Sequence, residues 1–195
     1  MKAYKDYVVT PVGSRYNNIK KIGKKELILN TEVSNHQYIN RLAKVVSTPM
    51  LFDSPIEVGD DIIVHHNVFR RWYNIRGEEK NSRSYLDDNK YIVSGDQVFL
   101  YKKDKWFTTP GYTFVKSMID DDTYSVEKEK NLIGVVKYSD NTFTKGDVIG
   151  FSPNQRMEYV IDGQKLWRIM NKFITIKYGH KGNQKEYNPS WAQSS

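Results

Sequence analysis

The two halves of this 195-residue sequence repeat one another, and this self-similarity constrains the fold more than any local motif. Four segments occur in the same order in each half. In the first half they read DYVVTPVG, RLAKVVSTP, EVGDDIIVHHNVFRRWY and NKYIVSGDQVFLYKK; in the second they read GYTFVKSM, LIGVVKYSD, TKGDVIGFSPNQRMEYV and QKLWRIMNKFITIKY. The strongest match pairs VGDDIIV (58–64) with KGDVIGF (145–151), where a Gly-Asp turn leads into an alternating apolar strand. The repeat predicts two tandem domains of one fold.

The repeated segments have the composition of β-strands. They are short, rich in β-branched and aromatic residues, and bounded by Gly, Pro, Asn and Asp, which is typical of small barrels built from strands and tight turns. We therefore expect an all-β fold of two small β-barrels, at 1–106 and 107–181, followed by a polar tail at 182–195. VFRRWYNIRG and QKLWRIMNKF also show some helical spacing, so helices there stay an alternative. We expect the tail either to be disordered or to form a strap pinned by Trp191.

The composition excludes several classes of protein. Without cysteine the chain forms no disulfides and has no thiolate chemistry, which fits a reducing cytoplasm. Neither the opening MKAYKDYVV nor any later run approaches the roughly 18 apolar residues of a membrane span, so we expect a soluble cytoplasmic protein. The net charge of +7 would favour acidic partners, but the basic residues are scattered among Asp and Glu, which favours a solvated basic surface.

The halves differ most in the connection after the first strand. The first half has a long segment at 13–40, whereas the second has only IDDDTYSVEKEKN at 119–131. A compact domain rarely contains a structureless connection longer than about 12 to 15 residues unless the connection is functional. The long segment contains one apolar cluster, formed by Leu27, Ile28 and Leu29, with polar flanks at Gly23, Lys24, Lys25, Glu26 and Asn30. The cluster is either a docking peptide or an edge strand of the barrel with Leu27 and Leu29 inward and Ile28 outward.

The order of these elements resembles the ten-kilodalton co-chaperonin, or GroES, family in two tandem copies. The matching elements are a first strand, a long loop with an apolar tripeptide, RLAKVV, the VGD turn-strand and NKYIVSGDQVFLYK. The resemblance implies two tandem GroES-like small β-barrels, the first with a mobile loop at about 13–40. It also implies that Leu27, Ile28 and Leu29 dock into the rim of a GroEL-type chaperonin. The implied assembly is a homo-oligomeric ring, by this resemblance a heptamer, without a cofactor of its own because the partner chaperonin binds the ATP.

The sequence departs from the family at four points. KELIL places Lys25 and Glu26 where the family usually has glycine, and STPMLFDSPIE is short for the family's roof hairpin. NIRGEEKNSRSYLDD is inserted after the VGD strand, and Asp120, Asp121 and Asp122 in the short second loop would repel an apolar groove. The loose match and the Lys/Asn/Tyr-rich composition favour a comparison with bacteriophage co-chaperonins, which act in the host cytoplasm.

The energetics of such a loop require an oligomer. Three apolar side chains entering a groove contribute about 5 to 8 kcal/mol, at roughly 1.5 to 3 kcal/mol each. Ordering even five residues costs on the order of 1 to 2 kcal/mol per residue. One loop alone therefore binds weakly, whereas several loops on one ring bind with strongly increased avidity.

The remaining chemical motifs do not predict an enzyme. The sequence contains no GxGxxG, GxxxxGK[ST] or GxSxG motif, and we expect no catalytic residue. His65 and His66 are adjacent on an expected strand, so their side chains would point to opposite faces and could not share a metal ion. The acidic clusters at 60–61, 87–88 and 120–122 are expected at turns, where carboxylates cap backbone N–H groups.

Two other functions compete with the co-chaperonin hypothesis. A nucleic-acid-binding β-barrel would use basic residues beside aromatic platforms. The candidates are Arg70, Arg71, Trp72 and Tyr73; Lys102, Lys103, Lys105 and Trp106; and Lys20, Lys21, Lys24 and Lys25. Packing of these aromatic side chains in the barrel or in a subunit interface is the favoured alternative to nucleic-acid contact. A phage structural protein that forms a ring with the same fold is the other competitor.

Overall fold

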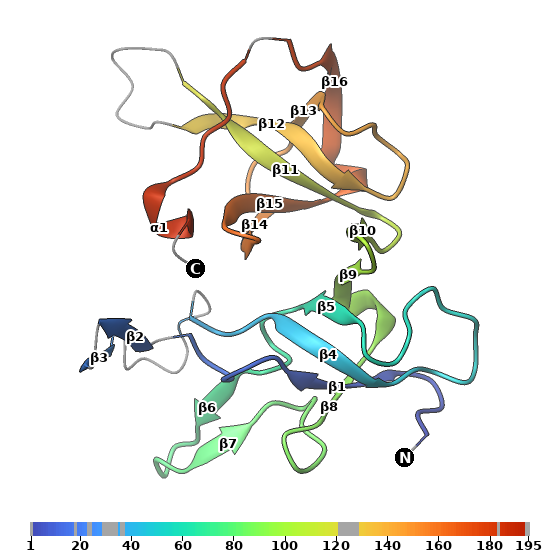
Figure 1. The fold of residues 1–195 in the computed structure, drawn as a ribbon, viewed down its shortest axis with the longest axis vertical. Coiled ribbons are helices and arrows are strands. Elements are labelled where there is room, and N and C mark those ends of the chain that lie inside the picture. The colour runs from blue at the N-terminus through green and yellow to red at the C-terminus, as the bar shows by residue number, and fades with distance from the viewer. Residues whose placement is uncertain are drawn as a thin grey trace. The chain divides into compact units, whose positions relative to one another are not determined.

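The computed structural model describes residues 2–17, 19–22, 25–28, 35, 38–120, 129–182 and 184–193. The chain divides into two compact units, Met1–Trp106 and Phe107–Ser195. Each unit contains one large antiparallel sheet (Figure 1). The all-β fold class is therefore confirmed. None of the helices in the described part of the chain has the length and apolarity needed to cross a bilayer.

The first unit is built on a six-stranded sheet of order β10-β9-β5-β4-β1-β8. Its strands are β1 (Tyr7–Pro11), β4 (Leu42–Ser47), β5 (Asp61–Val64), β8 (Tyr91–Val93), β9 (Val98–Lys102) and β10 (Trp106–Thr108), the last of which begins at the final residue of this unit and continues to Thr108. Two separate hairpins complete the unit: β2 (Ile19–Ile22) with β3 (Lys25–Ile28), and β6 (Arg71–Tyr73) with β7 (Glu79–Asn81). A 3-10 turn, η1 (Gly95–Gln97), joins β8 to β9.

The second unit has a six-stranded sheet of order β14-β15-β11-β12-β13-β16. Its strands are β11 (Tyr112–Ile119), β12 (Glu129–Ser139), β13 (Asp147–Phe151), β14 (Arg156–Ile161), β15 (Gln164–Met170) and β16 (Ile174–His180). A 3-10 turn, η2 (Asn171–Phe173), joins β15 to β16, and a short helix, α1 (Ser190–Gln193), follows. Among the described residues neither sheet closes on itself, so each is an open sheet rather than a closed barrel.

The two sheets repeat the same strand order and register. Strands β1, β4, β5, β8 and β9 correspond in position to β11, β12, β13, β15 and β16. The pair Val9↔Val45 of the first sheet corresponds to Val115↔Val136 of the second, and a bulge precedes the pair in both. The internal repeat is thus confirmed residue by residue. The helical alternative is wrong for both candidate segments because they contain β6 and β15.

Alternating apolar side chains form a separate core in each unit. In β4 the burial alternates along the strand, so that Ala43, Val45 and Ser47 face inward. The first core includes the fully buried Phe69 and Tyr91, whose rings meet edge to face with centroids 4.8 Å apart. In the second unit Val115, Val136, Ile149, Phe151 and Ile169 form an equivalent cluster.

The C-terminal strap, which we define as residues 184–193, packs on the second unit. The Ile119 N–H donates to Lys185 O (2.9 Å) and the Tyr187 N–H donates to Ser117 O (2.8 Å). Pro189 and Ala192 are buried, whereas Trp191 is half exposed. The strap alternative is therefore confirmed for these residues, and the anchoring role of Trp191 stays a prediction.

Candidate interaction site

The long segment of the first unit leaves the sheet through a paired neck, which we define as residues 12–17 and 38–42. Backbone hydrogen bonds join Val12 N to Leu42 O (3.0 Å), Asn40 N to Arg15 O (2.9 Å) and Asn17 N to Tyr38 O (2.7 Å). Tyr16 and Ile39 pair across the neck and are buried. The ends of the expected loop at 13–40 therefore belong to the folded unit, and the excursion itself begins after Asn17.

The buried Asn40 amide fixes the geometry of the neck. Its Nδ2 donates to Val12 O and Ser14 O, each at 2.8 Å, and its Oδ1 accepts a hydrogen bond from Leu42 N at 2.9 Å. One side chain thus satisfies three backbone groups where the two arms of the neck meet, which matters because unpaired buried backbone groups are costly.

The hairpin β2–β3 carries the predicted docking residues outside the six-stranded sheet (Figure 1). Its register pairs Lys20 with Leu27 and Ile19 with Ile28. Leu27 is 50% exposed and Ile28 is 60% exposed. The edge-strand alternative is wrong, because β3 pairs with β2 and not with the sheet, and Leu27 does not face its core. Of the other predicted residues, Lys25 and Glu26 are exposed on β3, whereas Gly23, Lys24, Leu29 and Asn30 lie outside the described residues.

The structure adds one apolar residue that the sequence analysis missed. Ile19 lies directly opposite Ile28 in the hairpin register and is 51% exposed. Cross-strand neighbours of this kind have side chains on the same face of the ladder. The sequence contains a signal for this pairing, because IKKI at 19–22 has apolar residues at both ends. A strand there that pairs with ELI at 26–28 brings Ile19 next to Ile28. The hairpin therefore exposes Ile19 and Ile28 together on one face and Leu27 on the other.

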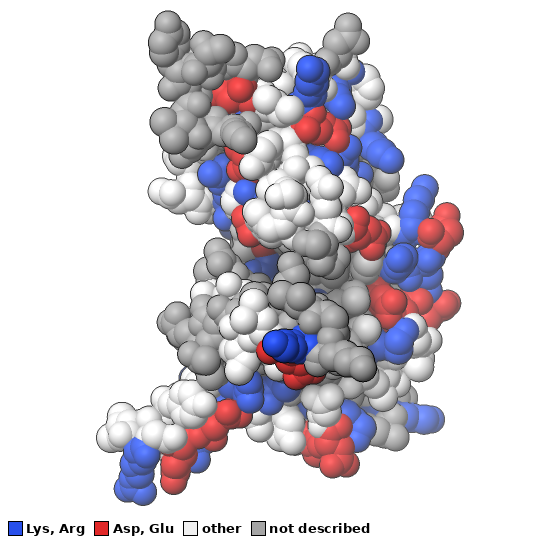
Figure 2. Space-filling view, turned by 60° about the vertical axis from the view of Figure 1, so that its left-hand side comes forward, with Lys and Arg blue, Asp and Glu red and all other residues white. Residues whose placement is uncertain are grey.

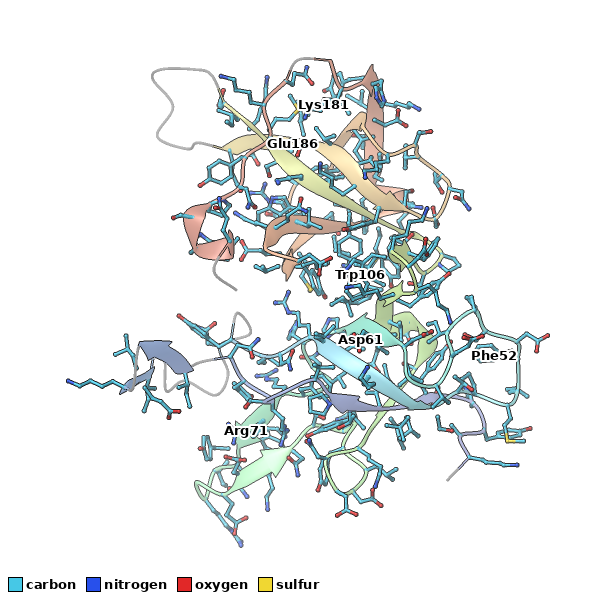
Figure 3. The ribbon with its side chains drawn as sticks, in the orientation of Figure 1. Phe52, Asp61, Arg71, Trp106, Lys181 and Glu186 are labelled. Atoms are coloured by element: carbon cyan, nitrogen blue, oxygen red, sulfur yellow. The ribbon has the colours of Figure 1, made fainter. Side chains whose placement is uncertain are left out.

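The insertion NIRGEEKNSRSYLDD begins in a second hairpin whose base is bonded to the neck. Arg15 donates through Nη2 to Phe69 O (3.1 Å) and through Nη1 to Asn81 Oδ1 (2.8 Å). The Arg71 N–H donates to the Tyr16 hydroxyl (2.8 Å), and the Arg71 guanidinium lies 4.5 Å from the centre of the Tyr16 ring (Figure 3). Two side chains of the neck thus hold the base of β6–β7.

The two predicted nucleic-acid clusters that contain aromatic residues differ in the structure. On β6, Trp72 and Tyr73 are 48% and 55% exposed, so their rings remain accessible. Trp106 is buried. Lys103 forms ion pairs with Asp60 (2.8 Å) and Glu57 (2.7 Å), and the hydrogen bonds to Asp60 and Glu57 raise the pKa of Lys103. The second cluster therefore offers neither a free stacking platform nor an uncompensated charge at Lys103.

The segment STPMLFDSPIE exposes a further apolar patch in place of a roof hairpin. Met50, Leu51 and Phe52 are all exposed, and the Leu51 N–H is held by Tyr4 O at 2.9 Å (Figure 3). These three consecutive residues are close in size and character to the predicted docking tripeptide, which makes them a matched set for mutational comparison.

The structure places the described residues of the histidine and carboxylate clusters at turns and strand ends. Strand β5 ends at Val64, so His65 and His66 do not alternate; their ring centroids lie 4.2 Å apart. The prediction that they face opposite sides is therefore wrong. Within the described ranges no three or more His, Asp or Glu side chains are grouped to hold a metal ion. Asp60 occupies a turn, where Oδ2 accepts a hydrogen bond from Glu57 N at 2.7 Å.

The charges on the face shown in Figure 2 are mixed, with basic and acidic side chains interspersed. Ion pairs such as Lys44–Asp61 (2.8 Å) and Arg71–Glu79 (3.2 Å) neutralise part of the basic excess. This distribution agrees with the expected solvated surface. No family model matches the sequence, and a search of curated proteins also finds no match.

Proposed function

We propose that this chain is a co-chaperonin that forms an oligomeric ring in the cytoplasm and caps a GroEL-type chaperonin during ATP-dependent protein folding. The observation that carries the proposal is the exposure of Leu27 and Ile28 on a hairpin outside the six-stranded sheet. The corresponding connection of the second repeat has no apolar tripeptide. An apolar cluster that the repeated fold does not require is best explained by binding.

The geometry of the neck supports this role. The excursion is anchored at its base by Tyr16, Ile39 and Asn40, so it leaves the unit at a fixed point. Because the base of the hairpin is already ordered, binding a partner costs little further conformational entropy there. Identical hairpins on one oligomer would in addition bind a multivalent partner with high avidity. Extended segments also bind partners through backbone pairing, which a strand such as β3 is able to provide.

The direct test changes the apolar tripeptide to serine. We expect L27S/I28S/L29S to lose nucleotide-dependent association with a GroEL-type chaperonin while its oligomeric mass is unchanged, as measured by co-sedimentation and native mass spectrometry. The matched control is M50S/L51S/F52S, which removes three exposed apolar residues from another loop of the same unit and should retain association. The proposal fails if the first variant still binds, or if both variants lose binding equally.

Nucleic-acid binding is the second candidate, because Trp72 and Tyr73 are exposed next to the exposed Arg70. Stacking of bases on such rings is tolerant of sequence, and phosphate contacts make it dependent on salt. A wild-type protein that never binds the chaperonin but shifts single-stranded oligonucleotides at low salt would favour this candidate.

A further inference from the structure

The C-terminal strap lies against the second sheet as an added strand would. Strand β11 runs to Ile119 but pairs with β15 over residues 112–115, which leaves the last part of this edge to the strap. There Met118 and Glu186 form an antiparallel bridge, and a backbone hydrogen bond lies on each side of it. Segments that bind a partner by strand addition use the same backbone pairing, and their alternate side chains supply the specificity.

Glu186 anchors the strap in a cluster of three lysines. Its carboxylate lies 2.7 Å from Lys137 Nζ, 3.0 Å from Lys181 Nζ and 3.8 Å from Lys116 Nζ (Figure 3). Lys116 is buried, and its pKa is lowered by this burial and by the two neighbouring ammonium groups, although the Glu186 charge opposes the shift. In the described part of the cluster three ammonium groups thus share one carboxylate, so their positive charge is only partly compensated.

The lysines of this site belong to the body of the second unit. Lys116 and Lys137 lie on β11 and β12, and the Lys181 N–H donates to Gly146 O at 2.7 Å. The strap itself follows the last strand of the repeat and is therefore an addition to the repeated fold. The site would thus remain if the strap moved away from it.

A second strap side chain, Asn188, binds backbone groups of the neighbouring turn. Its Oδ1 accepts a hydrogen bond from Lys165 N at 2.9 Å, and its Nδ2 donates to Gly163 O at 3.0 Å. In an extended segment, side chains two positions apart lie on the same face. The site therefore recognises an extended segment in which a carboxylate is followed two residues later by an amide.

We propose that the strap is a displaceable occupant of this site, and that the site binds an extended acidic peptide of a partner protein. The strap shows that an extended chain fits, and the excess of lysines shows which charge the partner needs. A second carboxylate on the face of Glu186, at the position of Gln184, would compensate the lysine cluster better than the strap does. This site lies in the second unit, so its binding of a peptide is independent of the proposed chaperonin contact in the first.

The test uses the full-length chain with fluorescein-labelled peptides. The variant E186K/N188A adds a fourth ammonium group to the cluster and removes the bonds of the amide, so it should release the strap from an unchanged site. The probe is QKEYNPSWAQ, which has the sequence of residues 184–193. We expect it to bind this variant at least about 10-fold more tightly than wild type, whose tethered strap competes. Fluorescence anisotropy measures both affinities.

The sequence of the peptide tests the chemistry of the partner. On E186K/N188A, the peptide QKQYNPSWAQ should bind about 10-fold more weakly than QKEYNPSWAQ, because hydrogen bonds to a charged group are lost. The peptide EKEYNPSWAQ, with its second carboxylate, should bind about 3-fold more tightly.

A matched pair of lysine variants tests the position of the site. Adding Lys137→Ala to E186K/N188A should weaken binding of QKEYNPSWAQ about 10-fold. Adding Lys145→Ala instead, at an exposed position of the same unit, should leave this binding unchanged.

A second measurement uses the wild-type chain, so it does not depend on the fold of any variant. With EKEYNPSWAQ in excess, amide hydrogen exchange of Tyr187 should become faster, because the strap leaves the site. Exchange of Ile119 should stay slow, because the peptide then accepts its N–H hydrogen bond in place of the strap.

The inference is overturned if no peptide binds E186K/N188A, if the Glu and Gln peptides bind equally, or if Tyr187 and Ile119 respond alike. Self-association of wild type that E186K/N188A abolishes would assign the site to the strap of a second copy, and would also overturn it. A wild-type chain that never binds a chaperonin refutes the proposed function and leaves these outcomes unaffected.

Discussion

At the scale of single residues, the two Gly-Asp turns show how closely the repeats match. Gly59 and Gly146 both have a φ of 93°, a conformation that favours glycine. The Gly59 N–H donates to Val45 O (2.8 Å), and the Gly146 N–H donates to Val136 O (2.9 Å), at equivalent points of the two sheets. These turns were predictable from the sequence because a Gly-Asp pair before an alternating apolar run has few other structures.

The two glycines differ in the space around them, which gives a first prediction. A Cβ on Gly59 would meet no atom within 4 Å, whereas one on Gly146 would overlap the His180 ring. We expect Gly59→Ala to cost about 1 to 2 kcal/mol of unfolding free energy from the backbone alone. Gly146→Ala should cost more in urea titrations, and the excess should disappear in a His180→Ala background. Equal costs for the two single variants would contradict the predicted clash.

At the scale of elements, the strand order could be predicted and the hairpins could not. The repeated strands combine β-branched residues with turn residues, so local pattern and repeat agree. ELIL has the same local pattern whether it pairs with the sheet or with β2, and only the three-dimensional pairing distinguishes the two. His65 and His66 were misassigned because nothing in DIIVHH marks Val64 as the last residue of β5. Likewise, the sequence does not show that Pro189 and Ala192 are buried in the strap, because their burial depends on which strap residues face the second unit.

The connection between the neck and β6–β7 gives a second prediction. Arg15 is held by Phe69 O and Asn81 Oδ1, and lysine lacks the forked geometry to reach both. We expect Arg15→Lys to lose about 1 to 3 kcal/mol of local stability and to speed amide exchange in both the neck and the base of the hairpin. Arg76→Lys, on the exposed turn of the same hairpin, is the matched control and should leave exchange unchanged. Faster exchange in only one of the two elements would show that they are not coupled.

The strap of the second unit gives a pH-dependent prediction. Glu186 forms ion pairs with Lys137 (2.7 Å) and Lys181 (3.0 Å) (Figure 3). Burial alone would raise the pKa of Glu186, but the hydrogen bonds from Lys137 and Lys181 together with the positive charges of these lysines lower it overall. A carboxyl group with a lowered folded-state pKa stabilises the fold above its unfolded pKa of about 4.3, and this stability is lost as the pH falls through the folded pKa.

We therefore expect Glu186→Gln to reduce the unfolding free energy by about 1 to 3 kcal/mol at pH 7, because the lysines lose their charged acceptor. The difference from wild type should shrink as the pH falls below about 4.3, where the wild-type carboxylate becomes protonated. Thermal unfolding measured at a series of pH values follows this difference. A difference that is constant across the series would mean that the Glu186 charge does not stabilise the strap.

At the scale of the whole molecule, the two units have sheets of the same topology but differ in the apolar side chains that they expose. The first unit presents the exposed hairpin β2–β3 from an anchored neck, whereas the described residues of the second unit contain no separate two-stranded hairpin. In the proposed co-chaperonin the hairpin of the first unit binds the chaperonin. This surface could not be located fully from the sequence, because the importance of Ile19 depends on its pairing with Ile28.

The most direct test of the account is amide hydrogen exchange of residues 19–28 in the wild-type protein, measured alone and with a GroEL-type chaperonin in the presence and absence of nucleotide. The account predicts that exchange in this hairpin slows when chaperonin and nucleotide are both present, while exchange in the exposed loop at 50–52 stays the same. Unchanged exchange at 19–28 under all conditions, or equal slowing at 50–52, would contradict the assignment of β2–β3 as the docking element.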